Sequence, residues 1–291
     1  PHIGKEHLYK KSGHLDCFHE NMYPPLKSEN ENYYLKPMNC PFHHRIFSSR
    51  LRSYRQLPLK LAEFGQVYRY EHSGSLRGLS RVRGLCQNDA HIYIEPAMSL
   101  EEVKKVLALH IQIYSYIGLE GYKFRLSKRD ANSPQLFQGS SEIWDQSEQI
   151  LKQALIDMKL DYYESVGDAA FYGPKIDIQM KLQNNVEESI SSIQLDFNSA
   201  VNFQLSYINS SGKAIAPWII HRAPIGSHER FIALLLEYFQ GQLPFWLRPI
   251  QFYLIPVDDE QVELCNKFQK QLVDLGLRVQ VDKSSGHLSK K

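Results

Sequence analysis

The sequence of 291 residues has few cysteines, little net charge and no long hydrophobic run. Its cysteines, at positions 17, 40, 86 and 265, show no paired spacing, which argues against a disulfide framework and is typical of a reducing compartment. No apolar run reaches about 18 residues, so we expect no contact with a membrane interior. The net charge of +2 is small for a protein that holds nucleic acid through a broad basic field. Any nucleic-acid contact is therefore expected to be local, or to lie partly outside this sequence.

The two ends of the sequence indicate a fragment of a longer protein. It opens at Pro1 rather than methionine and stops at Ser-Lys-Lys, just after a strand-like stretch. No signal peptide is visible. Hydrophobic residues make up 43%, which is enough to bury a sizeable core. We therefore expect one large domain and part of a second.

Hydrophobic patterning predicts an α+β fold. Most predicted strands alternate apolar and polar residues and follow one another without helical crossovers, which favours an antiparallel sheet with helices packed on one side. The predicted strands are 64–71, 85–94, 176–182, 193–197 and 215–223, and the predicted helices are 99–117, 141–158 and 231–239. Ser99 with Glu102 has the spacing of a capping box, and Ser227 is expected to cap the last helix.

The pattern changes near residue 249. A continuous apolar strand, IQFYLIP, is followed by an amphipathic helix over 258–275 and a strand, LRVQV. This order is the opening of a β-α-β unit. We expect a first domain over 1–248 and a partial α/β domain over 249–291.

Two segments carry unusual polar residues. The first is a hairpin in which Arg69 and Glu71 share one strand face, and Gln87, Asp89 and His91 share a face of the return strand. A solvated outer face would explain the alternation equally well. The loop between the strands, however, holds three glycines, which allow close backbone approach, and three arginines suited to phosphate oxygens, namely Arg77, Arg81 and Arg83.

The second segment is Gly226-Ser227-His228-Glu229-Arg230. It places Arg230 in the first turn of a helix, where the helix dipole favours anions and disfavours cations. Arg230 therefore needs a negative partner. Glu229 is the simple option, and a bound phosphate is the functional one.

These segments resemble class II aminoacyl-tRNA synthetases. Arg69-Tyr70-Glu71 with its loop is similar to motif 2 of that class, and Gly226–Arg230 is similar to motif 3. Within the class, six segments in order resemble the threonyl-tRNA synthetase family: YYLKPMNCPFH (33–43), SYRQLPLKLAEFGQVYRYEHSGSLRGLSRVRG (53–84), NDAHI (88–92), AFYGPK (170–175), IQLDF (193–197) and IIHRAPIGSHERF (219–231). The tail 249–291 resembles the start of the anticodon-binding domain of that family.

The resemblance implies an ATP site. Arg69 would contact the α-phosphate, Arg230 the γ-phosphate and Arg81 a further phosphate, while Glu71 would accept a hydrogen bond from the adenine amino group. Gln194 would lie beside the nucleotide, which binds with Mg²⁺. Attack of a carboxylate on the α-phosphorus needs positioning and charge neutralisation rather than a general base. Leu85 stands where the family has a phenylalanine that stacks on adenine, so weaker stacking is expected.

The resemblance also implies a zinc site made by Cys40, His91 and His221. Their spacing alone is weak evidence, because structural zinc sites use much shorter gaps. The compact cluster His14-Leu15-Asp16-Cys17-Phe18-His19 is the simpler candidate from spacing. Catalytic zinc sites, however, draw ligands from distant elements and leave positions open. His43 and His44 are interpreted as ordinary polar or packing residues.

Three protein ligands would leave zinc open to the amino and hydroxyl groups of threonine, which rejects valine because valine lacks the hydroxyl. Asp89 would accept the hydroxyl proton or orient the complex, and Asp196 would at most orient its neighbours. The resemblance adds Met38, Gln87, Tyr172 and Lys175 to the threonine pocket.

The implied activity is ligation of L-threonine to tRNA(Thr) through threonyl-adenylate. The implied partners are ATP, L-threonine, tRNA(Thr) and a second copy in a homodimer, in the cytoplasm or an organellar matrix. One rival is a sister synthetase for proline or serine, which zinc content would separate. Another is a synthetase-like binding protein without catalysis, which would be expected to lose Arg69 and Arg230.

Overall fold

The computed structural model describes residues 1–182 and 187–284 and divides the chain into two compact units, 1–234 and 235–291. The functional boundary expected at residue 248 stays a prediction. No helix within the described residues is both long and apolar enough to cross a membrane.

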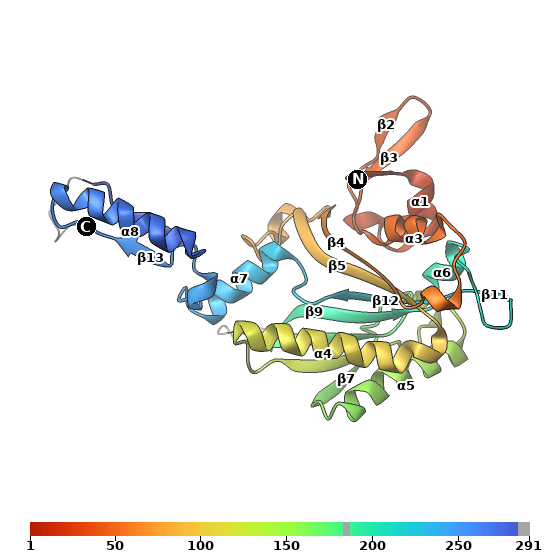
Figure 1. Ribbon diagram of the computed structural model, residues 1–291. Coiled ribbons are helices and arrows are strands. Elements are labelled where there is room, and N and C mark those ends of the chain that lie inside the picture. The colour runs from red at the N-terminus through yellow and green to blue at the C-terminus, as the bar shows by residue number, and fades with distance from the viewer. Residues whose placement is uncertain (183–186, 285–291) are drawn as a thin grey trace. The chain divides into compact units, whose positions relative to one another are not determined.

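A seven-stranded sheet is the centre of the first unit (Figure 1). Neighbouring strands are antiparallel except for the last pair, β6 and β7, which is parallel. In spatial order the strands are β4 (Leu59–Tyr68), β5 (Gly84–Ile94), β12 (Trp218–Ala223), β9 (Glu187–Asp196), β8 (Lys175–Lys181), β6 (Lys123–Lys128) and β7 (Tyr162–Val166). The expected α+β fold is confirmed. The prediction of an antiparallel sheet is wrong for this last pair. A helix lies between β6 and β7 in the chain, and such a crossover connection lets the two strands run in the same direction.

Two long helices lie against one face of this sheet, α4 (Ser99–Ile117) and α5 (Ser141–Asp157) (Figure 1). Their inward residues follow the predicted stripes: on α4, Val103, Val106, Leu107 and His110 are buried, whereas Ile111 is half-buried. The opposite face of the strands keeps its polar side chains. The helices therefore cover the apolar face and leave the other for chemistry.

Smaller elements complete the first unit. β1 (Ile3–Lys5), β2 (Leu26–Ser28) and β3 (Glu31–Leu35) form an antiparallel sheet in the order β1-β3-β2. The short helices are α1 (Glu6–Lys11), α2 (His14–Cys17), α3 (Cys40–Ser48) and α6 (Ser199–Asn202). β10 (Tyr207–Ile208) pairs with β11 (Ala214–Ile215). The division into units falls within α7 (His228–Tyr238).

Three local predictions need correction. The strand expected over 64–71 ends at Tyr68, so Arg69 and Glu71 lie just beyond it. The strand expected over 215–223 is broken at Pro217, which has no N–H to donate to a ladder. Ser99 is not a cap: it is the first residue of α4, and its hydroxyl donates to Pro96 O at 2.7 Å. Residues 96–98 already form a helical turn, so Ser99 lies inside the helical segment and does not cap its start.

The second unit has the predicted β-α-β order. β13 (Phe252–Leu254) and β14 (Val279–Val281) are parallel, and α8 (Val262–Asp274) connects them. Many apolar side chains of this unit are exposed, including Phe252, Leu264 and Phe268.

Candidate active site

Strand register brings together two histidines that are far apart in the sequence. His91 on β5 lies directly opposite His221 on β12, which in turn lies opposite Gln194 on β9. Cys40 is the first residue of α3. One ligand atom from each of Cys40, His91 and His221 lies within 4.8 Å of the others, and all three residues are buried. The three predicted ligands therefore form a compact cluster of one thiol and two imidazoles.

Each imidazole of this cluster is held by a second residue. His221 Nε2 lies 2.9 Å from Asp196 Oδ2, and His91 Nδ1 lies 2.7 Å from His43 Nδ1. His43 Nε2 in turn lies 3.1 Å from Glu63 Oε1. One nitrogen of each cluster histidine is thus occupied, and the contacts among residues 1–182 and 187–284 leave the other for a ligand. Carboxylates and other acceptors that orient ligating histidines are typical of metal sites.

Burial sets the protonation of the cluster. It raises the pKa of the Cys40 thiol, with Asp89 and Asp196 as further causes. It lowers the pKa of His91 well below its ordinary value, and His221 lowers it further. Without a cation the thiol is neutral, whereas a nearby divalent ion would stabilise the thiolate. The donor set fits Zn²⁺, which prefers sulfur and nitrogen ligands.

The compact cluster at 14–19 is not a metal site in this structure. His14 Nδ1 lies 2.6 Å from Ser12 Oγ and its Nε2 lies 3.2 Å from Met38 Sδ, so both ring nitrogens are engaged. Cys17 is exposed. Within 1–182 and 187–284, the Cys40 cluster is the one group of three or more such side chains that could hold a metal ion.

A cavity of about 100 Å³ adjoins the Cys40 cluster. Its wall holds most of the residues predicted for the threonine pocket, together with the three cluster residues and Arg69: Met38, Cys40, Arg69, Gln87, Asp89, His91, Tyr172, Gln194 and His221. Lys175 is not in this wall and lies instead beside the larger cavity described below. The polar face of the sheet is therefore hollowed where β5, β12 and β9 meet.

Packing fixes the side chains of this cavity. Asn39 Nδ2 donates to Asp89 Oδ2 at 3.0 Å, and burial raises the pKa of Asp89. The Tyr172 hydroxyl donates to Gln194 Oε1, and its ring stacks on His221 with 5.3 Å between centroids. The absence of a side chain at Gly173 lets this segment lie close to β9, because a Cβ at that position would lie 1.9 Å from the backbone oxygen of Leu195.

A second cavity, of about 290 Å³, adjoins the first. The two share Arg69, Gln87 and Gln194. The remaining wall includes the residues predicted for the nucleotide and Lys175: Glu71, Arg81, Leu85, Lys175 and Arg230. Two ligands bound in these cavities would meet beside Arg69.

The arginines of the larger cavity differ in their contacts. Arg69 is half-buried, and its enclosed Nε has no hydrogen-bond partner among the described residues. Burial lowers the pKa of Arg69, and the like charge of Arg230 lowers it further. Arg81 Nε donates to Glu71 Oε2 at 2.9 Å. A cation without a full set of partners favours an anionic ligand.

Glu229, the simple candidate for the negative partner of Arg230, is bound to another group. The Glu229 carboxylate accepts from the Cys86 backbone N–H at 3.0 and 3.2 Å. Arg230 Nε instead donates to the backbone oxygen of Ser80 in the β4–β5 loop at 3.1 Å. The Ser227 hydroxyl accepts from the Arg230 N–H at 3.3 Å, which confirms the predicted cap of α7. Arg230 thus retains guanidinium donors for a phosphate.

Sequence reasoning missed three residues of this region. His43 was interpreted as an ordinary histidine but contacts His91. Asn39 holds Asp89, and Asp177 lies in the wall of the larger cavity. The alternation over 176–182 was the available signal for Asp177, since it places Asp177 and Lys175 on one face.

Comparison with known proteins agrees with this geometry. Residues 23–239 match the family described as tRNA synthetase class II core domain (G, H, P, S and T). The solved RNA binding domain of threonyl-tRNA synthetase from Cryptosporidium parvum Iowa II is 39% identical with a TM-score of 0.92, over 100% of this chain and 72% of that chain. The chain belongs to the threonyl-tRNA synthetase family.

Two further members of the threonyl-tRNA synthetase family are similar. A putative threonyl-tRNA synthetase from Aeropyrum pernix is 37% identical with a TM-score of 0.86, over 100% of this chain and 67% of that chain. The threonine–tRNA ligase of Geobacillus kaustophilus is 44% identical over 283 residues, which are 97% of this chain and 43% of that protein. The chain therefore spans less than half the length of that relative.

Proposed function

We propose that this chain carries the aminoacylation site of a threonine–tRNA ligase, which activates L-threonine with ATP as threonyl-adenylate and transfers it to tRNA(Thr). The observation that carries the proposal is the placement of Cys40, His91 and His221 in the wall of a small cavity that opens onto an arginine-lined one. The first cavity would take the small amino acid and the second, with its arginines, the nucleotide.

Cys40, His91 and His221 would hold Zn²⁺. When bound, the ion would supply a Lewis acid for the amino and hydroxyl groups of threonine, which valine cannot match because it has no hydroxyl. Asp89 would accept the hydroxyl proton or orient the complex, and Tyr172 and Met38, which line the same cavity, would form the rest of the threonine pocket. Serine also carries a hydroxyl, so this pocket alone would discriminate against it weakly.

The arginines would bind ATP as its Mg²⁺ complex. Arg69 lies where the two cavities meet, so it is suited to neutralise the α-phosphate during attack by the threonine carboxylate. Arg230, at the start of α7, would hold the γ-phosphate, and Arg81 a further phosphate oxygen. Arg81 occupies only Oε2 of Glu71, which leaves Oε1 to accept from the adenine amino group. Gln194 would contact both ligands.

Two further parts belong to this proposal. They are tRNA(Thr) as the acceptor, which the family supports, and a homodimer in the cytoplasm or an organellar matrix, which rests on the resemblance alone. Because the chain spans less than half of its curated relative, recognition of tRNA is expected to involve surface outside it.

The decisive test is amino-acid-dependent ATP–pyrophosphate exchange. Threonine should support exchange, serine should support it at a lower but readily measurable rate because it carries the hydroxyl, and valine and proline should not. Cys40→Ser should lose zinc and threonine-dependent exchange but keep ATP binding, whereas Cys17→Ser, at an exposed position away from the cavities, should keep all three. Unchanged exchange in Cys40→Ser, or zinc-free active protein, would refute the metal-assisted recognition of threonine.

A further inference from the structure

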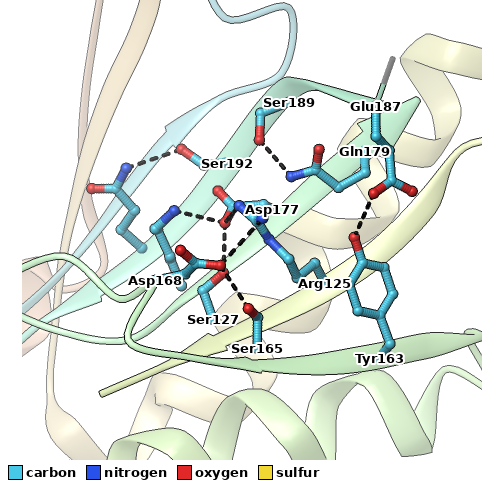
Figure 2. Close-up of polar contacts among 12 residues, drawn as sticks. Arg125, Ser127, Tyr163, Ser165, Asp168, Asp177, Gln179, Glu187, Ser189 and Ser192 are labelled. Atoms are coloured by element: carbon cyan, nitrogen blue, oxygen red, sulfur yellow. Dashed lines mark hydrogen bonds and ion pairs between the residues drawn. The ribbon is translucent and has the colours of Figure 1, made fainter. Parts of the chain in front are cut away.

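A buried carboxylate of β8 lies in the wall of the larger cavity, here called the nucleotide cavity, and accepts from three donors on one oxygen. Asp177 is 2% exposed. Its Oδ2 accepts from Lys175 Nζ at 2.6 Å. It also accepts from Ser127 Oγ at 2.7 Å and from Arg125 Nη2 at 3.0 Å, both labelled in Figure 2. A carboxylate with this many partners has a fixed orientation.

The donors of Asp177 have different surroundings. Lys175, two residues before Asp177 and on the same strand face, lines the nucleotide cavity. Arg125 and Ser127 come from the neighbouring strand β6 and do not line that cavity. Arg125 Nη1 is also anchored by Asp168 Oδ2 at 3.3 Å, and Asp168 accepts from Ser165 on β7 (Figure 2). The contacts thus run from the far edge of the sheet to the cavity wall.

We propose that Asp177 is a positioning residue that fixes the Lys175 ammonium group for the phosphates of ATP. This proposal rests on the proposed function, because it assigns ATP to the larger cavity. A lysine has a flexible four-carbon stem, and ordering it on a ligand costs rotamer entropy. Asp177 orders that side chain before ATP arrives, and Arg125 with Ser127 keeps the carboxylate aimed at it.

The charges of the cluster support the same role. Lys175 and Arg125 lie on neighbouring strands, and both donate to the Asp177 carboxylate. Without that carboxylate between them, the two cations would repel each other. Lys175 would then be repelled from its place at the cavity wall. The alternative is a purely structural role, in which Asp177 only neutralises the half-buried Arg125. The two roles differ in whether Asp177 acts through Lys175.

A double-mutant cycle separates these roles. Affinity for MgATP is measured by titration calorimetry for wild type, Asp177→Asn, Lys175→Met and the double variant. We expect each single change to weaken binding roughly tenfold, as for loss of a charge-assisted contact. We expect the double variant to bind no more weakly than Lys175→Met alone. Tyr163→Phe, which removes only the bond to Glu187 on the same sheet, should leave affinity unchanged.

If the losses of MgATP affinity in the two single variants add in the double variant, Asp177 does not act through Lys175. Either that result or full affinity in Asp177→Asn would overturn the positioning role. If Asp177→Asn does not fold, the cycle is run with Ser127→Ala, which removes an uncharged donor and keeps every charge. Ser127→Ala should weaken binding about threefold when Lys175 is present, and it should have no effect in the Lys175→Met background. Threonine-dependent exchange by wild type is measured in parallel. Its absence would refute the proposed function, whereas the cycle on ATP binding would still decide the role of Asp177.

Discussion

Replacing Arg69 with methionine should stabilise the ligand-free protein and remove its ability to use ATP. The methionine keeps an unbranched apolar stem of similar shape but has no charge and no donors. Arg69 is half-buried, its Nε is enclosed without a partner among the described residues, and Arg230 stands nearby with the same charge. The folded, empty protein therefore bears a cost that methionine relieves.

The magnitude follows from opposing contributions. An enclosed donor without a hydrogen bond costs about 1–3 kcal/mol. The guanidinium carbon lies 5.9 Å from the Phe18 ring centroid, and that cation–π contact offsets about 0.5–1 kcal/mol. Attraction to Glu71 offsets part of the rest. We expect a net gain of about 1 kcal/mol in the free energy of unfolding, which would raise Tm by about 2–4 °C.

Arg52 is the matched control. Burial also lowers its pKa, but its Nε donates to Phe47 O at 3.1 Å and its Nη2 to Ile46 O at 3.4 Å. Arg52→Met should therefore destabilise the protein. The assay is thermal and urea unfolding of wild type and both variants, with and without MgATP. Nucleotide should stabilise wild type and Arg52→Met but not Arg69→Met. A ligand-free Arg69→Met protein that melts below wild type would refute the reasoning.

Three other changes have expected outcomes. Arg230→Ala should raise the KM for ATP in pyrophosphate exchange about tenfold or more while leaving the threonine KM nearly unchanged; an unaltered ATP dependence would remove Arg230 from the phosphate site. Burial lowers the pKa of His110 to about 3, so this histidine stays neutral in the folded protein and takes up a proton only on unfolding. The stability that it contributes is complete above pH about 6.5 and falls by about 1.4 kcal/mol per pH unit toward pH about 3; His110→Gln should therefore make the loss of unfolding free energy with acid shallower, and an unchanged pH slope would contradict this. Gly173→Ala should destabilise by about 1–3 kcal/mol and lower kcat/KM, because its Cβ would meet the Leu195 oxygen; Gly74→Ala, where nothing lies within 4 Å, is the control for stability and should leave the free energy of unfolding nearly unchanged.

The parts of the fold that depend on local pattern could be predicted from sequence. The long helix over 99–117 and the strand alternation over 193–197 follow from periodicity, and both are observed. The predicted element boundaries were wrong where a single residue or a neighbouring turn overrides the hydrophobic pattern. Pro217 interrupts an apolar run that otherwise reads as a single strand, and the turn at 96–98 makes Ser99 a helical residue rather than a cap.

The candidate site depends on pairing between distant segments, which local pattern does not contain. Nothing around His91 or His221 indicates that β5 and β12 pair in the register that sets the two rings opposite each other. Cys40 reaches the same place from the start of α3. From sequence, only the resemblance to a family predicted that these three residues form one site. Contacts such as His43 with His91, or Lys175 with Asp177, became visible once the strands were placed.

On the proposed function, the two cavities would explain why adenylate formation needs positioning rather than a general base. They share Arg69, so the carboxylate of one ligand and the α-phosphate of the other would meet beside a fixed positive charge. Both groups are anionic and repel each other in water, and on the proposed function the half-buried guanidinium would reduce that repulsion in the transition state. The same placement leaves Arg69 without enough partners when neither ligand is bound. The predicted instability of the empty site and the proposed stabilisation of the reacting pair would therefore have one physical origin.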